Sequence, residues 1–154
     1  MKHFPSQGKS FWGFRYALEG LYCTIREESH MRFHICAAIG TTMFTEYYDF
    51  SKYDYGLLFI AIAFVLITEL ANTSAEHLVD LCTDEYKTDA KKAKDTAAAF
   101  VLVAAMFSLA VAYILFFDTK ILFPSLLNIF TRPKYIIFFV LTVLFVIKGG
   151  KNER

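Results

Sequence analysis

The stretch TAAAFVLVAAMFSLAVAYILFF, from Thr96 to Phe117, contains no charged side chain. An apolar run of about 18 residues or more is long enough for a helix to cross a bilayer. A second run begins at Tyr55, carries no charge as far as Thr68, and continues with few charges to Leu81. These two runs predict an integral membrane protein built from transmembrane helices.

The composition of the whole chain agrees with membrane embedding. Of its 154 residues, 56% are hydrophobic and 20% are charged, whereas soluble domains average about 45–50% apolar residues. The net charge of +1 gives no basic field that would attract nucleic acid, so no nucleic-acid partner is expected. The length corresponds to a single membrane-embedded domain, residues 1–154.

Two segments before Tyr55 add to the predicted all-α fold. In Ser10 to Glu28, apolar residues recur at steps of three and four, as on one stripe of an amphipathic helix. They are Phe11, Phe14, Leu18, Leu21 and Ile25. We expect this helix at the membrane surface, with its apolar stripe against lipid or against the other helices. Phe33 to Thr45 follows as a short first span, and the tyrosine-rich turn after it is typical of a membrane–water interface.

A further apolar segment, Tyr135 to Ile147, lies near the C-terminus. It has 13 residues, a length that is also typical of an interfacial or re-entrant element. Because Lys134 and Lys148 could extend from its two ends to the headgroups, we favour a fourth transmembrane helix. The predicted fold is therefore a surface helix, three transmembrane helices and this C-terminal one.

The positive charges favour a cytoplasmic N-terminus. With four spans, the 16 lysine and arginine residues divide into twelve on the N-terminal side and four on the other. An excess of lysine and arginine in short loops marks the cytoplasmic side of a membrane protein.

Four polar side chains stand on one face of the second long run. Glu69, Asn72, Glu76 and Asp80 are three, four and four residues apart, a helical spacing. Helix rise puts Glu69 roughly 21 Å below the outer end of the run, inside the bilayer. A charge at such a depth costs about 2.5–3.5 kcal/mol on insertion scales and normally marks a functional pathway. The other interpretation is a structural patch that pairs with Lys or Arg from another helix.

Two further groups are predicted at the same side of the membrane. Glu28 ends the amphipathic helix, and Lys94–Asp95 precede the Thr96 run. Carboxylates are oxygen ligands for Mg²⁺, which proteins usually share with substrate phosphates, and a lysine can bind a phosphoryl oxygen. Phosphoryl transfer suits such a set because it needs positioning and electrostatics. In that reaction Glu69 would accept the proton of a hydroxyl group within the membrane.

Other candidate motifs predict no site. His30 and His34 are four residues apart, but no third metal ligand is evident and we expect an interfacial role for both. Gly149-Gly150-Lys151 lacks the earlier glycine and the following Ser or Thr of a phosphate-binding loop.

The segment ELANTSAE, from Glu69 to Glu76, followed by Val79-Asp80 and Ala93-Lys94-Asp95, resembles the signature of the prokaryotic diacylglycerol kinase and undecaprenol kinase family. Phe14-Arg15-Tyr16-Ala17 and Met31-Arg32-Phe33-His34 are also similar to that family. The resemblance covers roughly residues 9–117 and leaves residues 118–154 as a C-terminal extension.

The resemblance implies a small helical enzyme of the bacterial inner (cytoplasmic) membrane. Members transfer the γ-phosphate of Mg-ATP to the hydroxyl of a membrane lipid, usually as homotrimers with active sites shared between subunits. By position it implies Glu69 as the catalytic base and Glu28 and Glu76 as ligands of Mg²⁺. The residues implied around ATP are Tyr16, Glu28, Asn72, Glu76, Glu85, Tyr86, Lys94 and Asp95.

The lipid acceptor is expected to be undecaprenol, with diacylglycerol as the alternative. The Met31–His34 run is more similar to the undecaprenol kinase branch of the family. Three positions depart from the family pattern: Ala75 replaces a larger aliphatic residue, Lys87 stands where histidine is common, and Lys9 lies near a position that is arginine in some members.

Two non-catalytic functions remain as alternatives. A transporter would also place Glu69 and Glu76 within a span, but it typically has broken helices or an internal repeat, which the sequence lacks. An assembly protein would explain a stripe of small residues suited to close helix packing, Ala98, Ala105, Ser108 and Ala112. It would not explain the carboxylates.

Overall fold

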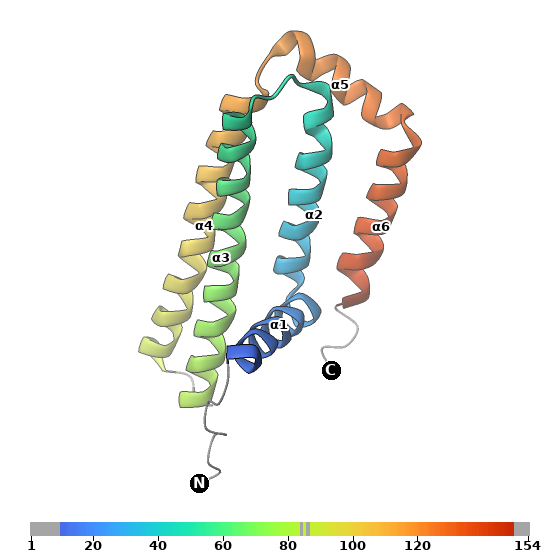
Figure 1. The fold of residues 1–154 in the computed structure, drawn as a ribbon. Coiled ribbons are helices and arrows are strands. Elements are labelled where there is room, and N and C mark those ends of the chain that lie inside the picture. The colour runs from blue at the N-terminus through green and yellow to red at the C-terminus, as the bar shows by residue number, and fades with distance from the viewer. Residues whose placement is uncertain (1–9, 84, 86, 150–154) are drawn as a thin grey trace.

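The computed structural model describes residues 10–83, 85 and 87–149, and within them the regular elements are all helical (Figure 1). In chain order they are α1 (Ser10–Glu27), α2 (Ser29–Phe44), the 3-10 turn η1 (Thr45–Tyr47), α3 (Lys52–Cys82), α4 (Thr88–Phe116), α5 (Thr119–Thr131) and α6 (Pro133–Gly149). The prediction of an all-α protein is confirmed.

The helices form an elongated bundle that is closed by a crosswise helix at each end. Figure 1 shows α2, α3 and α4 running side by side, with α1 across one end and α5 across the other. The chain then returns as α6, which packs on α2. The longest packing interface joins α3 to α4.

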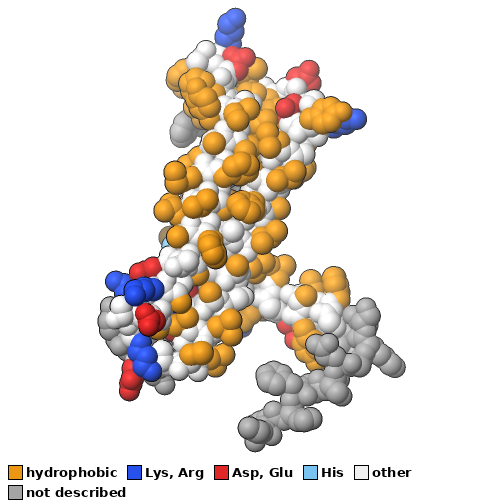
Figure 2. Space-filling model, turned by 90° about the vertical axis from the view of Figure 1, so that its left-hand side faces the viewer, with side chains coloured by type: hydrophobic (Ala, Val, Ile, Leu, Met, Phe, Trp, Pro, Cys, Tyr) orange, Lys and Arg blue, Asp and Glu red, His pale blue; other side chains and the backbone are white. Residues whose placement is uncertain are grey.

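The bundle is suited to a bilayer by length and composition. Two helices, α3 and α4, are long and apolar enough to cross a membrane, and α5 with α6 would be a third candidate if this pair, bent by 71°, formed one broken span. Hydrophobic side chains cover the middle of the bundle in Figure 2, whereas charged side chains gather at its two ends. The chain is thus an integral membrane protein, while α2, at 16 residues, is about 24 Å long, so its expected crossing stays a prediction.

The helix α1 agrees with the predicted surface helix. Its large apolar residues Phe14, Leu18 and Leu21 are between 40% and 66% exposed in the single chain, so they are available to lipid. The backbone turns at Glu28, which is extended with φ −93° and ψ 117°. Arg32 is buried, and its Nη1 donates to the carbonyl oxygens of Ile25 and Arg26 at 3.2 and 2.6 Å. A cation at these last carbonyls of α1 favours the end of the helix.

Side chains also define the start of α3 and its packing on α4. Ser51 and Asp54 form a reciprocal capping box at the N-terminus of α3, which satisfies backbone donors that a helix end leaves open. Farther along, the buried residues recur at helical spacing on both helices. They are Leu58, Ala61 and Val65 on α3, and Ala97, Ala104 and Val111 on α4. The small side chains allow the two backbones to approach closely.

The tyrosine-rich segment forms the predicted turn between α2 and α3. Phe44, Tyr48 and Phe50 each pack against the ring of Phe116 at the far end of α4. The hydroxyl of Tyr48 also donates to the Phe116 carbonyl oxygen at 2.8 Å. This aromatic cluster ties the α2–α3 turn to the end of α4.

The C-terminal helix α6 docks on α2 and contains the predicted apolar segment Tyr135 to Ile147. The buried hydroxyl of Tyr135 donates to the carbonyl oxygen of Met43 and to Oε1 of Glu46, and Lys134 forms an ion pair with the same Glu46 carboxylate. Gly40 allows the close approach, because a Cβ there would lie 3.1 Å from the Phe138 ring.

Candidate active site

A buried carboxylate lies where α2 packs on α3. The Glu69 side chain is 6% exposed, and its Oε1 is 3.0 Å from Nε2 of His34, whose side chain is 20% exposed. The spacing that predicted a deep carboxylate in the second run is therefore matched by a buried one. Burial of an unpaired carboxylate is costly, and the His34 contact offsets that cost.

Two further polar residues continue from Glu69 along α3. Asn72 Nδ2 donates to Oε1 of Glu76 at 2.9 Å, and both side chains are half-buried. The Oδ1 atom of Asn72 is buried and has no hydrogen-bond partner among the residues that the structure describes. Glu76 follows Glu69 by two helical turns, roughly 10 Å along the axis. One face of α3 thus carries polar groups from its buried part toward its end, as predicted.

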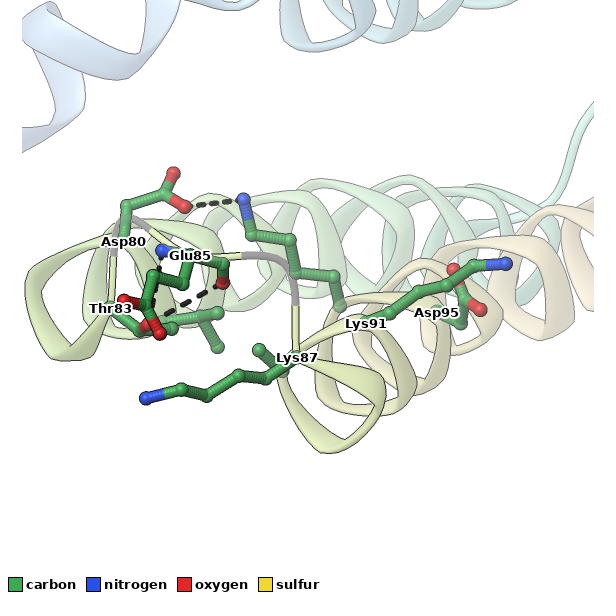
Figure 3. A pocket seen from close by; sticks show the side chains of 9 residues that line it. Asp80, Thr83, Glu85, Lys87, Lys91 and Asp95 are labelled. Carbon is green, nitrogen blue, oxygen red and sulfur yellow. Dashed lines mark hydrogen bonds and ion pairs between the residues drawn. The ribbon is translucent and has the colours of Figure 1, made fainter.

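A polar pocket of about 560 Å³ lies where α3 ends and α4 begins. Lys94 Nζ is 2.5 Å from Oδ1 of Asp80, which joins the two helices. Figure 3 shows Asp80 and Glu85 on the α3 side of this pocket, and Lys91 and Asp95 on the α4 side. Lys87 also lines it. A pocket with both signs of charge and this volume is large enough for a small molecule.

The predicted site residues fall into separate places in one chain. Lys94, Asp95 and Glu85 line the pocket, whereas Glu69 lies with His34 between α2 and α3. Tyr16 is exposed on α1, and Glu28 is half-buried at the turn between α1 and α2. Tyr86 lies outside the described residues.

The predicted metal ligands are not gathered into a site. Within residues 10–83, 85 and 87–149, no three His, Cys, Asp or Glu side chains are close enough together to hold a metal ion. The roles of Glu28 and Glu76 as ligands therefore stay predictions. The pocket that contains Lys94 and Asp95 is also lined by Asp80, Glu85, Lys87 and Lys91. Of these four, only Glu85 was among the residues implied around ATP.

Sequence reasoning missed the partner of Glu69. His34 was expected at an interface, and its contact with Glu69 joins residues 35 positions apart that no spacing rule connects. A signal was present, since His34 stands in the Met31–His34 run that resembles one branch of the family.

An apolar groove of about 370 Å³ lies between α2, α3 and α4, and His34 is among its lining residues. Small side chains of α4 form one wall: Ala105, Ser108 and Ala112. Three members of the predicted small-residue stripe thus face this groove.

Comparison with known proteins connects these features to a family. The family model of the prokaryotic diacylglycerol kinases matches residues 15–116. The undecaprenol kinase of Bacillus subtilis is 33% identical over 114 residues, which are 74% of this chain and 93% of that protein. A diacylglycerol kinase of Helicobacter pylori is 34% identical over 92 residues, 60% of this chain and 72% of that protein. No solved structure gives a significant match.

The matched region covers α1 to α4 apart from the first residues of α1, and it ends where α4 ends. It includes every residue of the polar α3 face, the polar pocket and the His34–Glu69 contact. A membrane bundle with a buried carboxylate and a polar pocket at one end is consistent with a lipid kinase, and a kinase implies a nucleotide phosphoryl donor. The chain belongs to the prokaryotic diacylglycerol kinase family and is a membrane-embedded lipid kinase.

Proposed function

We propose that this lipid kinase transfers the γ-phosphate of Mg-ATP to the hydroxyl group of undecaprenol, producing undecaprenyl phosphate. The observation that carries the proposal is the buried Glu69 carboxylate on a helix that is suited to cross the membrane. A long polyprenol keeps its hydroxyl near the membrane, so the base that removes its proton must be held at membrane depth. Glu69 fits that requirement, whereas the exposed Asp80 and Asp95 do not.

In the proposed reaction, Glu69 is the general base. As the acceptor oxygen attacks the γ-phosphorus, its O–H bond breaks and the proton moves to the Glu69 carboxylate. A new P–O bond forms to the lipid, and the bond between the γ-phosphorus and the bridging oxygen breaks. ADP leaves with the electron pair of that bond.

The polar pocket at the α3–α4 turn is the proposed binding region for the phosphates of ATP. Lys94 supplies a positive charge for a phosphoryl oxygen, and Asp80 holds its ammonium group in place. We assign Asp95, Glu85, Tyr16 and Tyr86 to the surroundings of the nucleotide by their positions in the family pattern.

We propose that Glu28 and Glu76 hold Mg²⁺ together with the phosphates of ATP. Their chemistry fits, because Mg²⁺ prefers oxygen ligands and keeps several of them from water and phosphate. The unpartnered Oδ1 of Asn72 adds a buried oxygen beside the Glu76 carboxylate. When bound, the metal ion would neutralise charge on the phosphates.

A homotrimer with shared active sites is the proposed assembly. In one chain the base, the polar pocket and Glu28 lie on different parts of the bundle, and no described trio of ligands gathers. A second subunit would bring such groups together. The positive charges favour a cytoplasmic N-terminus in the bacterial inner membrane, which would place the pocket where ATP is present.

Diacylglycerol is the alternative acceptor, and relatives named for each lipid have similar identity to the chain. We favour undecaprenol because the alignment with the undecaprenol kinase extends over 93% of that protein, against 72% for the diacylglycerol kinase. The His34 of the Met31–His34 run, now found beside the proposed base, is the second reason.

The test is transfer of labelled phosphate from ATP to undecaprenol and, in parallel, to diacylglycerol in mixed micelles. We expect undecaprenol to be labelled preferentially, and Glu69→Gln to lower turnover by about 10²–10⁴-fold. Asp49→Asn is the matched control, since it also replaces a carboxylate with an amide, but at an exposed residue of the α2–α3 turn. Preference for diacylglycerol would change the acceptor but not the mechanism, and labelling of neither lipid by folded protein would refute kinase activity on both.

A further inference from the structure

We propose that His34 is a positioning residue for this reaction, holding the Glu69 carboxylate in its ionised state and in a fixed orientation. This inference rests on the proposed function of Glu69 as the base. A base must be deprotonated to accept the proton of the acceptor hydroxyl, yet burial favours the protonated acid. The side chain of Glu69 is 6% exposed, so an ionised Glu69 needs a nearby group that stabilises its charge.

The contact identifies the two atoms that face each other. His34 Nε2 lies 3.0 Å from Glu69 Oε1, a hydrogen-bond distance. An unprotonated Nε2 would set its lone pair against a carboxylate oxygen, since both atoms would then be acceptors. The proposed base is ionised before the transfer, and in that state Nε2 carries the hydrogen and donates it to Oε1, in the neutral imidazole and in the imidazolium alike. Hydrogen bonds to an ionised carboxylate favour the charged form.

Three other ionisable side chains of these helices make their printed contacts elsewhere. Arg32, also on α2, directs its Nη1 to the carbonyl oxygens of Ile25 and Arg26. Lys94 on α4 pairs with Asp80. Glu76, farther along α3, accepts from Asn72. Across the described helices, His34 is thus the one ionisable side chain bonded to the Glu69 carboxylate.

The same bond leaves one carboxylate oxygen for chemistry. Oε1 accepts from His34, whereas Oε2 has no hydrogen-bond partner among the described residues. In the transfer step the acceptor's O–H bond breaks and its proton goes to Oε2, while the acceptor oxygen bonds the γ-phosphorus and ADP departs. His34 neither gains nor loses a proton in that step. Its role is to fix which oxygen receives one and to keep that oxygen unprotonated beforehand.

The test compares His34→Leu, His34→Gln and wild type by their turnover as a function of pH. Leucine removes the donor, so we expect kcat to fall about 10- to 100-fold, the range for one hydrogen bond to a charged group. The acid limb of the kcat profile should move relative to that of wild type, because the carboxyl loses the donor that His34 supplies. The KM for ATP should stay unchanged.

His34→Gln is the rescue variant, because its amide N–H can donate to the same carboxylate without an ionisable ring. It should recover most of the lost turnover and return the acid limb toward its original position. His30→Leu is the matched control, four residues earlier on α2 and exposed, and it should change neither quantity.

A spectroscopic measurement covers the event that His34→Leu fails to fold. His34→Met also lacks the donor, so infrared difference spectra of this variant and of wild type are recorded during acid titration. Both should contain a protonated-carboxyl band that Glu69→Gln removes, and the midpoint of that band should differ between the two proteins. An unchanged kcat and acid limb in the Leu variant, or an infrared midpoint equal in wild type and the Met variant when the Leu variant does not fold, refutes the proposal. A uniform fall in kcat at every pH with an unmoved limb does so too, since it indicates a purely structural contact. If wild type phosphorylates no lipid alcohol, the proposed function fails instead.

Discussion

The ammonium group of Lys94 lies 2.5 Å from Oδ1 of Asp80, joining the first turns of α4 to the last turns of α3. Both side chains are more than a third exposed, so the pair contributes only about 0–1 kcal/mol to folding stability. The pair instead positions the Lys94 ammonium group at the polar pocket.

The first prediction concerns this cation. Lys94→Met should raise the KM for ATP about tenfold or more, because a charge-assisted contact to a phosphoryl oxygen is lost. Steady-state kinetics at several ATP concentrations measure this change. Lys92→Met is the control, since Lys92 is exposed and pairs with Asp89 outside the pocket. An equal effect of both substitutions would point to general charge rather than to a specific phosphate contact.

The second prediction concerns the amide that orients Glu76. Asn72→Leu removes the 2.9 Å hydrogen bond to Glu76 and the buried Oδ1 atom. We expect the Mg²⁺ concentration for half-maximal activity to rise about 10- to 100-fold, the usual effect of losing a group that orients a metal ligand. Magnesium titrations of turnover provide the measurement. Ser74→Ala, on the exposed side of α3, should leave the requirement unchanged; an unaltered requirement in the Leu variant would remove Asn72 from the metal region.

The third prediction concerns the turn between α1 and α2. Arg32→Met should lower the free energy of unfolding by roughly 1–3 kcal/mol, because the Ile25 and Arg26 carbonyl oxygens lose a charged donor. Unfolding in mixed detergent micelles, followed by circular dichroism, measures it. Arg26→Met is the control, because that side chain is exposed. Equal stability of the Arg32 variant and wild type would mean that the guanidinium does not hold this turn.

The fourth prediction concerns the docking of α6. Gly40→Leu should displace α6 from α2, since even a Cβ at this position would lie 3.1 Å from the Phe138 ring. Overpacking of this kind typically costs about 1–3 kcal/mol. Hydrogen exchange of α6 amides should accelerate. Gly56→Leu is the control, because a Cβ there meets nothing within 4 Å, and comparable exchange in both variants would contradict the predicted displacement.

The fifth prediction concerns pH. The hydrogen bond from Lys134, helped by the Tyr135 hydroxyl, holds the pKa of Glu46 below its usual range. A lowered pKa in the folded state means that this contact stabilises docking at neutral pH and is lost as pH falls from about 4.3, the ordinary value, through the folded value. Exchange of α6 amides should therefore rise on acidification in wild type. In Glu46→Gln it should be faster at neutral pH and less dependent on acid.

Much of the bundle follows from local patterns. The charge-free run from Thr96 and the three–four spacing of Glu69, Asn72 and Glu76 depend on helix periodicity and membrane thickness, so the sequence alone predicts α3, α4 and a polar face on α3. The charge-free run begins at Thr96, whereas α4 begins earlier, at Thr88. Lys94 therefore lies on a helix, in reach of Asp80.

The partners across helices could not be predicted in this way. His34 contacts Glu69 only because α2 packs on α3 in one particular register. That register depends on side-chain packing between helices, and a single sequence does not show which of the alternative registers is most stable. The α5 helix was not predicted, since Pro124 lies inside it and proline normally disfavours a helix interior. The Glu46–Lys134 pair joins residues 88 positions apart, which no periodicity connects.

The return of α6 along α2 also matters for protein engineering. Because the chain comes back from α5, α1 and the last turn of α6 lie toward the same end of the bundle (Figure 1). A fluorophore on α1 and another near the end of α6 would therefore lie at the same end of the bundle. The efficiency of energy transfer between the two fluorophores would report whether α6 stays docked on α2 in living cells. No probe would be needed at the opposite end, where α5 lies.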